Sequence, residues 1–299
     1  MGALVVVIFC VTAGLVIARL PHPAGLAQAL NWWVVYIALP ALVLGQITVL
    51  DSSAPMLLPA LSIWLVFLGG WLFIALAGYL LGWPRDKTGA LVLTAGLGNT
   101  SFVGYPLVEA LRGEAALGMA VIADQFGSFL MLSTLGLVVA AIYSGQRVKI
   151  FGILQRVLVF PAFWALLLAL ALRALDLAPS MLMELSQRLG VTLTPLALFS
   201  VGLQLRLRSA GSDSLPLLLG LSWKLLLAPL LAILFLWLNA ALNSPSADII
   251  ILQAAMAPMV TAGILAQQYN LAPALASRMV GIGLMFSLVT VPLLSFGLL

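Results

Sequence analysis

Long apolar stretches follow one another along nearly the whole 299-residue chain, and this feature limits the possible folds most. A helix that crosses the hydrocarbon core of a membrane needs about 20 apolar residues, so the chain has room for roughly ten such helices. Charged residues make up only 7% of the sequence, compared with about 25% in soluble domains. The sequence therefore predicts an all-α integral membrane protein and excludes a water-soluble fold.

Connectors that are charged or rich in Pro, Gly, Ser and Asn divide the chain into ten predicted transmembrane helices. We interpret the first as a retained membrane helix, with a signal anchor as the alternative. The ten helices are expected near residues 2–20, 29–49, 57–81, 87–111, 115–142, 150–174, 184–206, 215–241, 247–269 and 273–298.

The two halves of the chain are similar to each other. Leu30-Asn31 precedes Pro40 as Leu185-Ser186 precedes Pro195, at a spacing of 155 residues. Because each half has five predicted helices, an odd number, the second half must enter the membrane from the opposite side. We therefore predict two inverted five-helix repeats, residues 1–142 and 150–299.

The basic residues are scattered singly over the connectors, which is not the pattern of a nucleic-acid-binding face. In a membrane protein they mostly set the orientation, because cytoplasmic loops carry the excess of Lys and Arg. The pattern predicts an inner-membrane protein with both termini outside. The cytoplasmic set is Arg19, Arg85, Lys87, Arg147, Lys149, Arg156, Arg206, Arg208 and Arg278, and the outer set is Arg112, Arg173 and Arg188.

Two of the predicted helices contain runs of Gly, Pro and small polar residues, at 96–106 in the fourth helix and at 253–263 in the ninth. Proline removes a backbone donor and glycine weakens a helix, so both helices should break there. Interrupted helices at matching places in two repeats are typical of a midplane binding site in secondary transporters. The alternative is that these residues only kink the helices or allow close packing.

Three motifs resemble the auxin efflux carrier family, most closely its bacterial branch. They are Gly98-Asn99-Thr100 with Pro106, then Ala123-Asp124-Gln125, and then residues 199–203. The resemblance covers nearly the whole chain, although the long hydrophilic central loop of many plant members is absent. It implies ten helices in which helices four and nine break at prolines and cross at the membrane centre, an elevator-like motion of one domain, and a homodimer.

The resemblance also implies that Asn99 helps to hold a substrate carboxylate beside the crossing. An amide can do this because it supplies two donors without a buried charge. The alternative role of Asn99 is a helix cap at the break. The predicted substrate-binding residues are Gly98, Asn99, Thr100, Ser101, Pro106, Gln253, Pro258, Met259 and Thr261.

Asp124 and Lys224 lie about nine to ten residues into their predicted helices, at a depth where an unpaired charge costs several kcal/mol. Asp124 is a candidate proton carrier, or else a structural ion-pair partner or hydrogen-bond acceptor. Lys224 is a candidate to neutralise Asp124 or a substrate anion, or else its side chain extends to water along the helix. A metal site and histidine-based catalysis are not predicted, because His22 is the only histidine and Cys10 the only cysteine.

The sequence thus predicts a secondary transporter that moves a small organic anion, an auxin-like carboxylate or a dicarboxylate, across the bilayer without a cofactor. The carboxylate class is implied by the resemblance alone. Two alternatives stay open, a sodium-coupled symporter of the bile-acid symporter type and a membrane sensor that binds a ligand without moving it. An enzyme is not predicted, since no segment gathers a nucleophile, a base and an orienting group.

Overall fold

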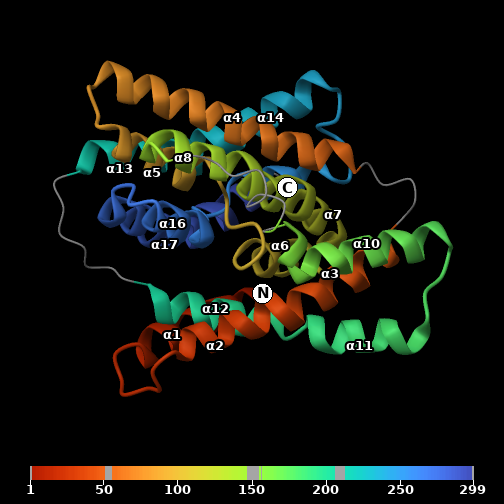
Figure 1. The fold of residues 1–299 in the computed structure, drawn as a ribbon. Coiled ribbons are helices and arrows are strands. Elements are labelled where there is room, and N and C mark those ends of the chain that lie inside the picture. Colours follow the sequence, from red (N-terminus) through yellow and green to blue (C-terminus); the bar gives the residue numbers. More distant parts are fainter. Residues whose placement is uncertain (1, 51–55, 147–154, 156, 206–212, 298–299) are drawn as a thin grey trace. The chain divides into compact units, whose positions relative to one another are not determined.

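The computed structural model describes residues 2–50, 56–146, 155, 157–205 and 213–297. Its regular elements in these ranges are helices (Figure 1). Five helical stretches are long and apolar enough to cross a membrane: Leu26–Thr48, Leu57–Leu80, Glu114–Ser144, Ser214–Leu238 and Pro273–Gly297. These features are those of a multi-pass membrane protein.

Some of the predictions fall outside the described residues. These are the orientation signals Arg147, Lys149, Arg156, Arg206 and Arg208, the first part of the predicted helix 150–174, and the end of the predicted helix 184–206.

The chain divides into two compact units, each built from three separate stretches of sequence. Unit 1 comprises Met1–Met56, Ser101–Val121 and Gln155–Leu205, and unit 2 comprises Leu57–Thr100, Ile122–Leu154 and Arg206–Leu299. Each unit takes segments from both halves of the chain. The units are therefore a different division from the two predicted repeats, which stay a prediction.

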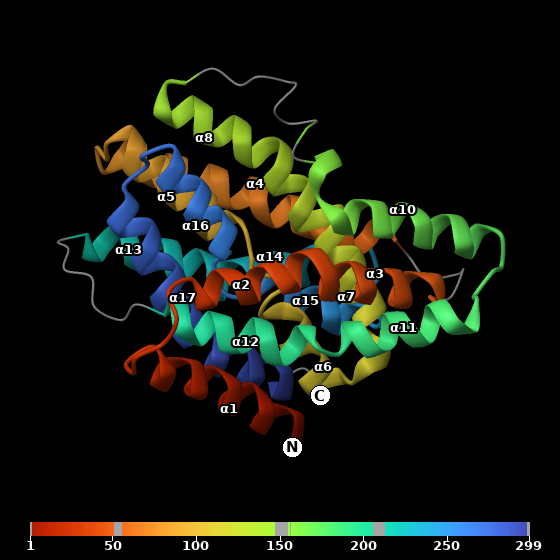
Figure 2. The ribbon, with the colours of Figure 1, turned by 60° about the horizontal axis from the view of Figure 1, so that its bottom comes forward.

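Unit 1 is a set of helices around the long helical stretch Leu26–Thr48. In chain order its helices are α1 (Gly2–Ile17), α2 (Leu26–Trp33), the π-helical η1 (Val34–Ala38), α3 (Leu39–Thr48), α6 (Gly104–Arg112), the short 3-10 helix η2 (Glu114–Ala116), the start of α7 (Leu117–Ile122), α10 (Pro161–Ala174), α11 (Ser180–Gly190) and α12 (Leu193–Gln204). Helices α10 and α11 pack against α3, and α1 lies along α12 (Figures 1 and 2).

The contact between α1 and α12 depends on two glycines. A Cβ at Gly14 would collide with the carbonyl oxygen of Phe199, and one at Gly202 would collide with the carbonyl oxygen of Val11. Small residues at a crossing let two helix backbones approach closely, which is how helices in membranes gain packing energy.

Unit 2 contains the second predicted helix break and the first part of the first one, up to Thr100. Its helices are α4 (Leu57–Leu80), α5 (Arg85–Gly96), the π-helical η3 (Ala123–Phe129) and η4 (Leu132–Gly136), α8 (Leu137–Ser144), α13 (Ser214–Ser222), the π-helical η5 (Trp223–Leu227), α14 (Ala228–Leu238), α15 (Ala247–Ala254), α16 (Val260–Gln268) and α17 (Pro273–Gly297). Residues of α5 such as Leu91 and Leu93 are fully buried in the apolar core of this unit.

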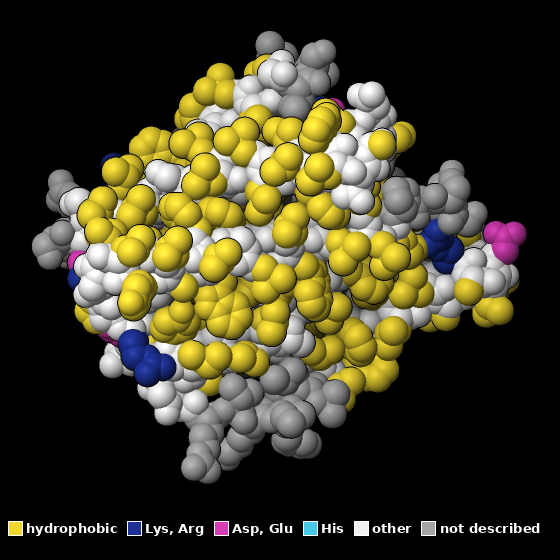
Figure 3. Space-filling model, turned by 90° about the horizontal axis from the view of Figure 1, so that it is seen from above, with side chains coloured by type: hydrophobic (Ala, Val, Ile, Leu, Met, Phe, Trp, Pro, Cys, Tyr) yellow, Lys and Arg dark blue, Asp and Glu magenta, His cyan; other side chains and the backbone are white. Residues whose placement is uncertain are grey.

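The outer faces of the long helices are apolar. On α4 the exposed side chains include Leu61, Leu68, Leu72 and Leu76, which recur at helical spacing. Figure 3, a view from above Figure 1, shows apolar side chains spread across the face and the charged ones at its margins. A soluble protein would not leave such a surface to water, whereas lipid tails cover it without cost.

Two predicted helices differ from the structure. The predicted helix 184–206 is divided into α11 and α12 around Val191 and Thr192, because Pro195 has no N–H to continue the ladder. The predicted helix 150–174 is interrupted at Phe160, which is extended before Pro161, the first residue of α10. A residue that precedes proline is disfavoured in the helical region, and proline is favoured at a helix start.

Candidate functional site

The break in the fourth predicted helix occurs where the glycines and the proline predict it. Helix α5 ends at Gly96, Leu97 is extended, and α6 begins at Gly104. Pro106 is the third residue of α6, where its missing N–H is one of the donors that a helix start leaves unpaired in any case. In a continuous helix its ring would clash with the carbonyl group of Phe102, four residues earlier. Helices α5 and α6 therefore cannot form one straight helix.

The ninth predicted helix breaks in the same way. Helix α15 ends at Ala254 and α16 begins at Val260, with Met259 extended before it. Pro258 accounts for the interruption, because it lacks the donor that a continuous helix would need. Both breaks thus have a local cause that can be seen in the sequence.

The two breaks pair with each other through their backbones within unit 2. Gly98 and Pro258 face each other as a single antiparallel bridge. The N–H of Asn99 donates to the carbonyl of Ala257 over 2.7 Å, and the N–H of Met259 donates to the carbonyl of Leu97 over 2.9 Å. In this pattern the facing residues themselves exchange no hydrogen bond, so proline fits at position 258 without loss. We call residues 97–100 and 254–259 the crossing.

A buried polar network surrounds the crossing. The hydroxyl of Thr100 donates to Oδ1 of Asp124, and Nε2 of Gln125 donates to Oδ2 of the same carboxylate. Nε2 of Gln253 donates to the carbonyl of Thr100 over 3.2 Å. Because these four side chains are almost fully buried, hydrogen bonds must replace the lost hydration of the carboxylate.

Among the described residues of unit 2, Lys224 is the second charged residue that is buried, with 1% of its surface exposed. Its ammonium donates to the carbonyl of Ala254 over 2.9 Å. The alternative that Lys224 extends to water is wrong, since burial and this bond hold it inside. Its bond goes to the backbone of the crossing rather than to Asp124, so a charge pair with Asp124 stays a prediction.

Both buried charges lie in π-helical turns, Asp124 in η3 and Lys224 in η5. Pro229 follows η5 and removes the N–H that would bond to the carbonyl four residues earlier, which favours a wider turn. Such turns shift side chains out of the regular helical register and are frequent at functional sites.

The predicted substrate-binding residues are divided between the units. Asn99, Thr100, Gln253 and Met259 are buried at the crossing together with Gly98 and Pro258, and Thr261 follows on α16 with an exposed side chain. Ser101 and Pro106 fall in unit 1. The structure thus brings seven of the nine together in unit 2, and their role in binding stays a prediction.

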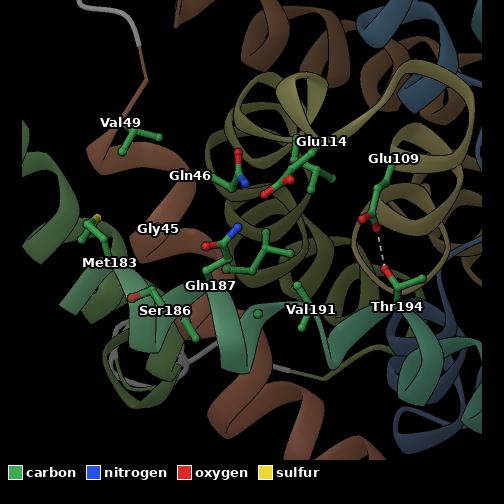
Figure 4. A pocket seen from close by; sticks show the side chains of 14 residues that line it. Gly45, Gln46, Val49, Glu109, Glu114, Met183, Ser186, Gln187, Val191 and Thr194 are labelled. Carbon is green, nitrogen blue, oxygen red and sulfur yellow. Dashed lines mark hydrogen bonds between the residues drawn. The ribbon is translucent and has the colours of Figure 1, made fainter. Parts of the chain in front are cut away.

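Unit 1 has a separate pocket, a hollow of about 240 Å³. Figure 4 shows Gln46, Gln187 and Glu114 directed into it, and Glu109 at one side accepting a hydrogen bond of 2.8 Å from Thr194. Two carboxylates and no basic side chain occur among the described residues that line it, so its lining disfavours an anion. The lining residues are Ala41, Leu42, Gly45, Gln46, Val49, Glu109, Glu114, Leu117, Met183, Ser186, Gln187, Gly190, Val191 and Thr194.

Sequence reasoning did not find this pocket. Gln46 and Glu109 are polar residues inside predicted helices, but each lies near a helix end, where polar residues are ordinary. The available signal was that Gly45, Ser186 and Gly190 are small, and small residues also serve helix packing. Small residues can either line a pocket or let helices pack closely, and only the observed packing of α3 against α11 shows that these line a pocket.

Comparison with known proteins decides the family. The family model described as "Membrane transport protein" matches residues 1–152 and 146–295, which is nearly the whole chain in two successive stretches. The chain belongs to this family. It is the family of the auxin efflux carriers, so the resemblance seen in the motifs is confirmed.

Two relatives from archaea support the same assignment. A protein named "Uncharacterized transporter" from Methanothermobacter thermautotrophicus is 28% identical over 272 residues, which cover 90% of this chain and 88% of the relative. An uncharacterized transporter from Methanocaldococcus jannaschii is 31% identical over 196 residues, or 60% of each chain. Both names describe transporters rather than enzymes.

Proposed function

We propose that this membrane transport protein is a secondary carrier for a small organic anion, with the substrate carboxylate bound at the crossing in unit 2. The paired helix breaks are the observation that carries this proposal, because they put unwound backbone and helix ends inside an apolar protein. Irregular backbone at membrane depth is stable only when protein or a wet cavity surrounds it.

The start of α16 is the proposed seat of the carboxylate. The first N–H groups of a helix have no partner within the helix, and together they carry a partial positive charge. No side chain caps this end, where Met259 is the flanking residue. Thr261, in the first turn, adds an exposed hydroxyl, and Asn99 lies in the segment 97–100 that pairs with the residues before α16. An anion is the ligand that this arrangement favours.

The charges in unit 1 favour the same choice. A carboxylate substrate in the pocket would face Glu109 and Glu114, and like charges repel each other. The crossing differs from the pocket because it has a basic side chain, Lys224, against its backbone as well as the carboxylate of Asp124 in its network. The contrast supports the crossing as the anion site.

The transport step follows from the two compact units. In our proposal the ten predicted helices span the membrane as inverted repeats, with both termini outside, and unit 2 carries the crossing from one side of the bilayer to the other against unit 1. Unit 1 provides the dimer contact. Two units with separate cores suit such an elevator motion, because each can move as a body without repacking its interior.

The decisive experiment is uptake of a panel of labelled carboxylates into proteoliposomes, for the unaltered protein and for Asn99→Ala. We expect saturable uptake that falls at least tenfold in the variant, since a loss of about 1.4 kcal/mol of binding energy is tenfold. Asn239→Ala is the matched control, because Asn239 is an exposed asparagine at the end of α14. Normal uptake by Asn99→Ala would place the substrate elsewhere, and ligand binding without flux would indicate a sensor.

Asp124→Asn tests the proposed proton link. The amide keeps the size of the side chain and an acceptor for Thr100, but it cannot carry a proton. We expect uptake that no longer responds to a pH gradient. An unchanged response would mean that Asp124 is a structural acceptor.

A further inference from the structure

The ammonium of Lys224 lies where the two helix breaks meet. It donates to the carbonyl of Ala254, the last residue of α15. A Cβ at Gly98 would stand 2.9 Å from Nζ of Lys224, 3.3 Å from its Cε and 3.4 Å from the carbonyl oxygen of Gln253. The ammonium therefore rests against the backbone of both breaks, and the missing side chain of Gly98 leaves it the room.

This place carries negative potential from the backbone. Helix α5 ends at Gly96 and α15 ends at Ala254, so both helices direct their C-terminal ends towards the crossing. The last carbonyls of a helix lack partners within it, and together they carry a partial negative charge. In transporters with broken helices, such ends and unwound carbonyls are where coupling cations bind.

The side chains add to this effect. The carboxylate of Asp124 is connected to the same backbone through Thr100, whose carbonyl also accepts a bond from Gln253. The amino group of Lys224 thus stands beside two helix C-terminal ends and against the backbone that the Asp124 network also contacts. A side chain of the protein thus occupies a position where a bound monovalent cation would neutralise the negative helix ends.

We propose that Lys224 is a tethered cation that occupies the place of a coupling ion, so that transport does not depend on sodium or potassium. The inference rests on the proposed carrier function and names its ion requirement. It has a second consequence. Removing the ammonium while keeping an apolar stem of similar length should leave a seat for a small free cation, either an alkali ion or methylammonium.

The first arm of the test measures carboxylate uptake in proteoliposomes whose only cation is sodium, potassium, methylammonium or choline. For the unaltered protein we expect rates that agree within twofold in all four. For Lys224→Met we expect a loss of at least tenfold in choline and recovery of a third or more of the lost rate in sodium or methylammonium. Lys224→Arg should keep its rate without added cations.

Lys87→Met is the matched control, because Lys87 is a partly exposed lysine of unit 2 in an ion pair with Asp213. The same chemical change there should lower uptake by less than twofold, with no response to cations. A sodium requirement in the unaltered protein would overturn the proposal. Full activity of Lys224→Met in choline, or loss of activity that no small cation restores, would overturn it as well.

The second arm does not need transport and separates this inference from the carrier proposal. The melting temperature of the purified protein in detergent is measured in sodium chloride and in choline chloride. We expect sodium to raise the melting temperature of Lys224→Met by at least 3 °C more than that of the unaltered protein. Equal shifts in both proteins would overturn the tethered-cation assignment even if no carboxylate were carried. If Lys224→Met does not fold, Lys224→Gln replaces it in both arms with the same expected outcomes.

Discussion

The crossing in unit 2 and the pocket in unit 1 are both polar regions inside an apolar protein, but their polar side chains differ in burial. At the crossing, Thr100, Asp124 and Gln253 bond to one another and to paired backbone, with little exposed surface. In the pocket, Gln187 and Glu114 are exposed side chains directed into an open hollow. The crossing is therefore a fixed structure, and the pocket is a region where side chains can adapt.

The difference matters because buried polar groups are costly to disturb. A donor or acceptor that loses its partner inside a protein costs about 1–3 kcal/mol, whereas an exposed one regains water. Function at the crossing is thus tied to stability, but changes in the pocket should leave the fold intact. Two pairs of variants and one single variant test this contrast.

The largest effect is expected from crowding the crossing. A methyl at Gly283 on α17 would overlap the ring of Pro258, whereas a methyl at Gly45 beside the pocket would stand an ordinary 3.4 Å from Cβ of Ser186. We expect Gly283→Ala to lower the free energy of unfolding by about 2–3 kcal/mol, as overpacking does, and Gly45→Ala by less than about 0.5 kcal/mol. Thermal unfolding in detergent measures both. Equal decreases in the free energy of unfolding would mean that the crossing accommodates an added methyl group as easily as the pocket does.

A smaller effect is expected from Thr100→Val, which keeps the shape of the side chain and removes the donor to Asp124. The carboxylate then keeps its charge with one bond fewer, at a cost of about 1–3 kcal/mol. Thr94→Val in α5, the helix that precedes the break, is the control, because its hydroxyl only bonds back to the carbonyl of Ala90. Urea unfolding of the two variants compares them. If Thr94→Val lowered the free energy of unfolding as much as Thr100→Val, the hydrogen bond to Asp124 would contribute no more than a hydroxyl within an ordinary helix.

The smallest effect is expected from Glu109→Gln in the pocket. The amide keeps an oxygen to accept the bond from Thr194, and it removes one negative charge. We expect carboxylate uptake to change by less than about twofold, because in our proposal the anion binds at the crossing. The measurement is the initial rate at a substrate concentration far below saturation. A tenfold change would move the anion site into unit 1 and would remove the contrast between the two regions.

Much of the fold could be predicted because its causes are local. The length and apolarity of the stretches predict membrane helices, and Pro106 and Pro258 with their neighbouring glycines predict the breaks. The division of helix 184–206 at Val191 was missed even though its cause, Pro195, is in the sequence. A single proline also occurs inside helices that continue, as Pro292 does in α17, so it does not decide the outcome alone.

The candidate site could be predicted in its residues but not in its connections. Asp124 and Lys224 stand out because an ionisable residue in an apolar helix is costly and needs a reason. Their partners, Thr100 and Ala254, lie 24 and 30 residues away along the chain. No local pattern indicates which carbonyl an ammonium will reach. The prediction that Lys224 neutralises Asp124 or a substrate anion stays a prediction, whereas the alternative that its side chain extends to water is wrong.

From the sequence alone one can predict a helical membrane protein with two interrupted helices, whose motifs resemble a transport family. Helix length, hydrophobicity and proline chemistry act within a few residues, so they can be read without coordinates. Only the tertiary structure decided that Gly98 pairs with Pro258 and that the ammonium of Lys224 rests on the carbonyl of Ala254. These contacts join segments far apart in the chain, and the packing of whole helices brings them together.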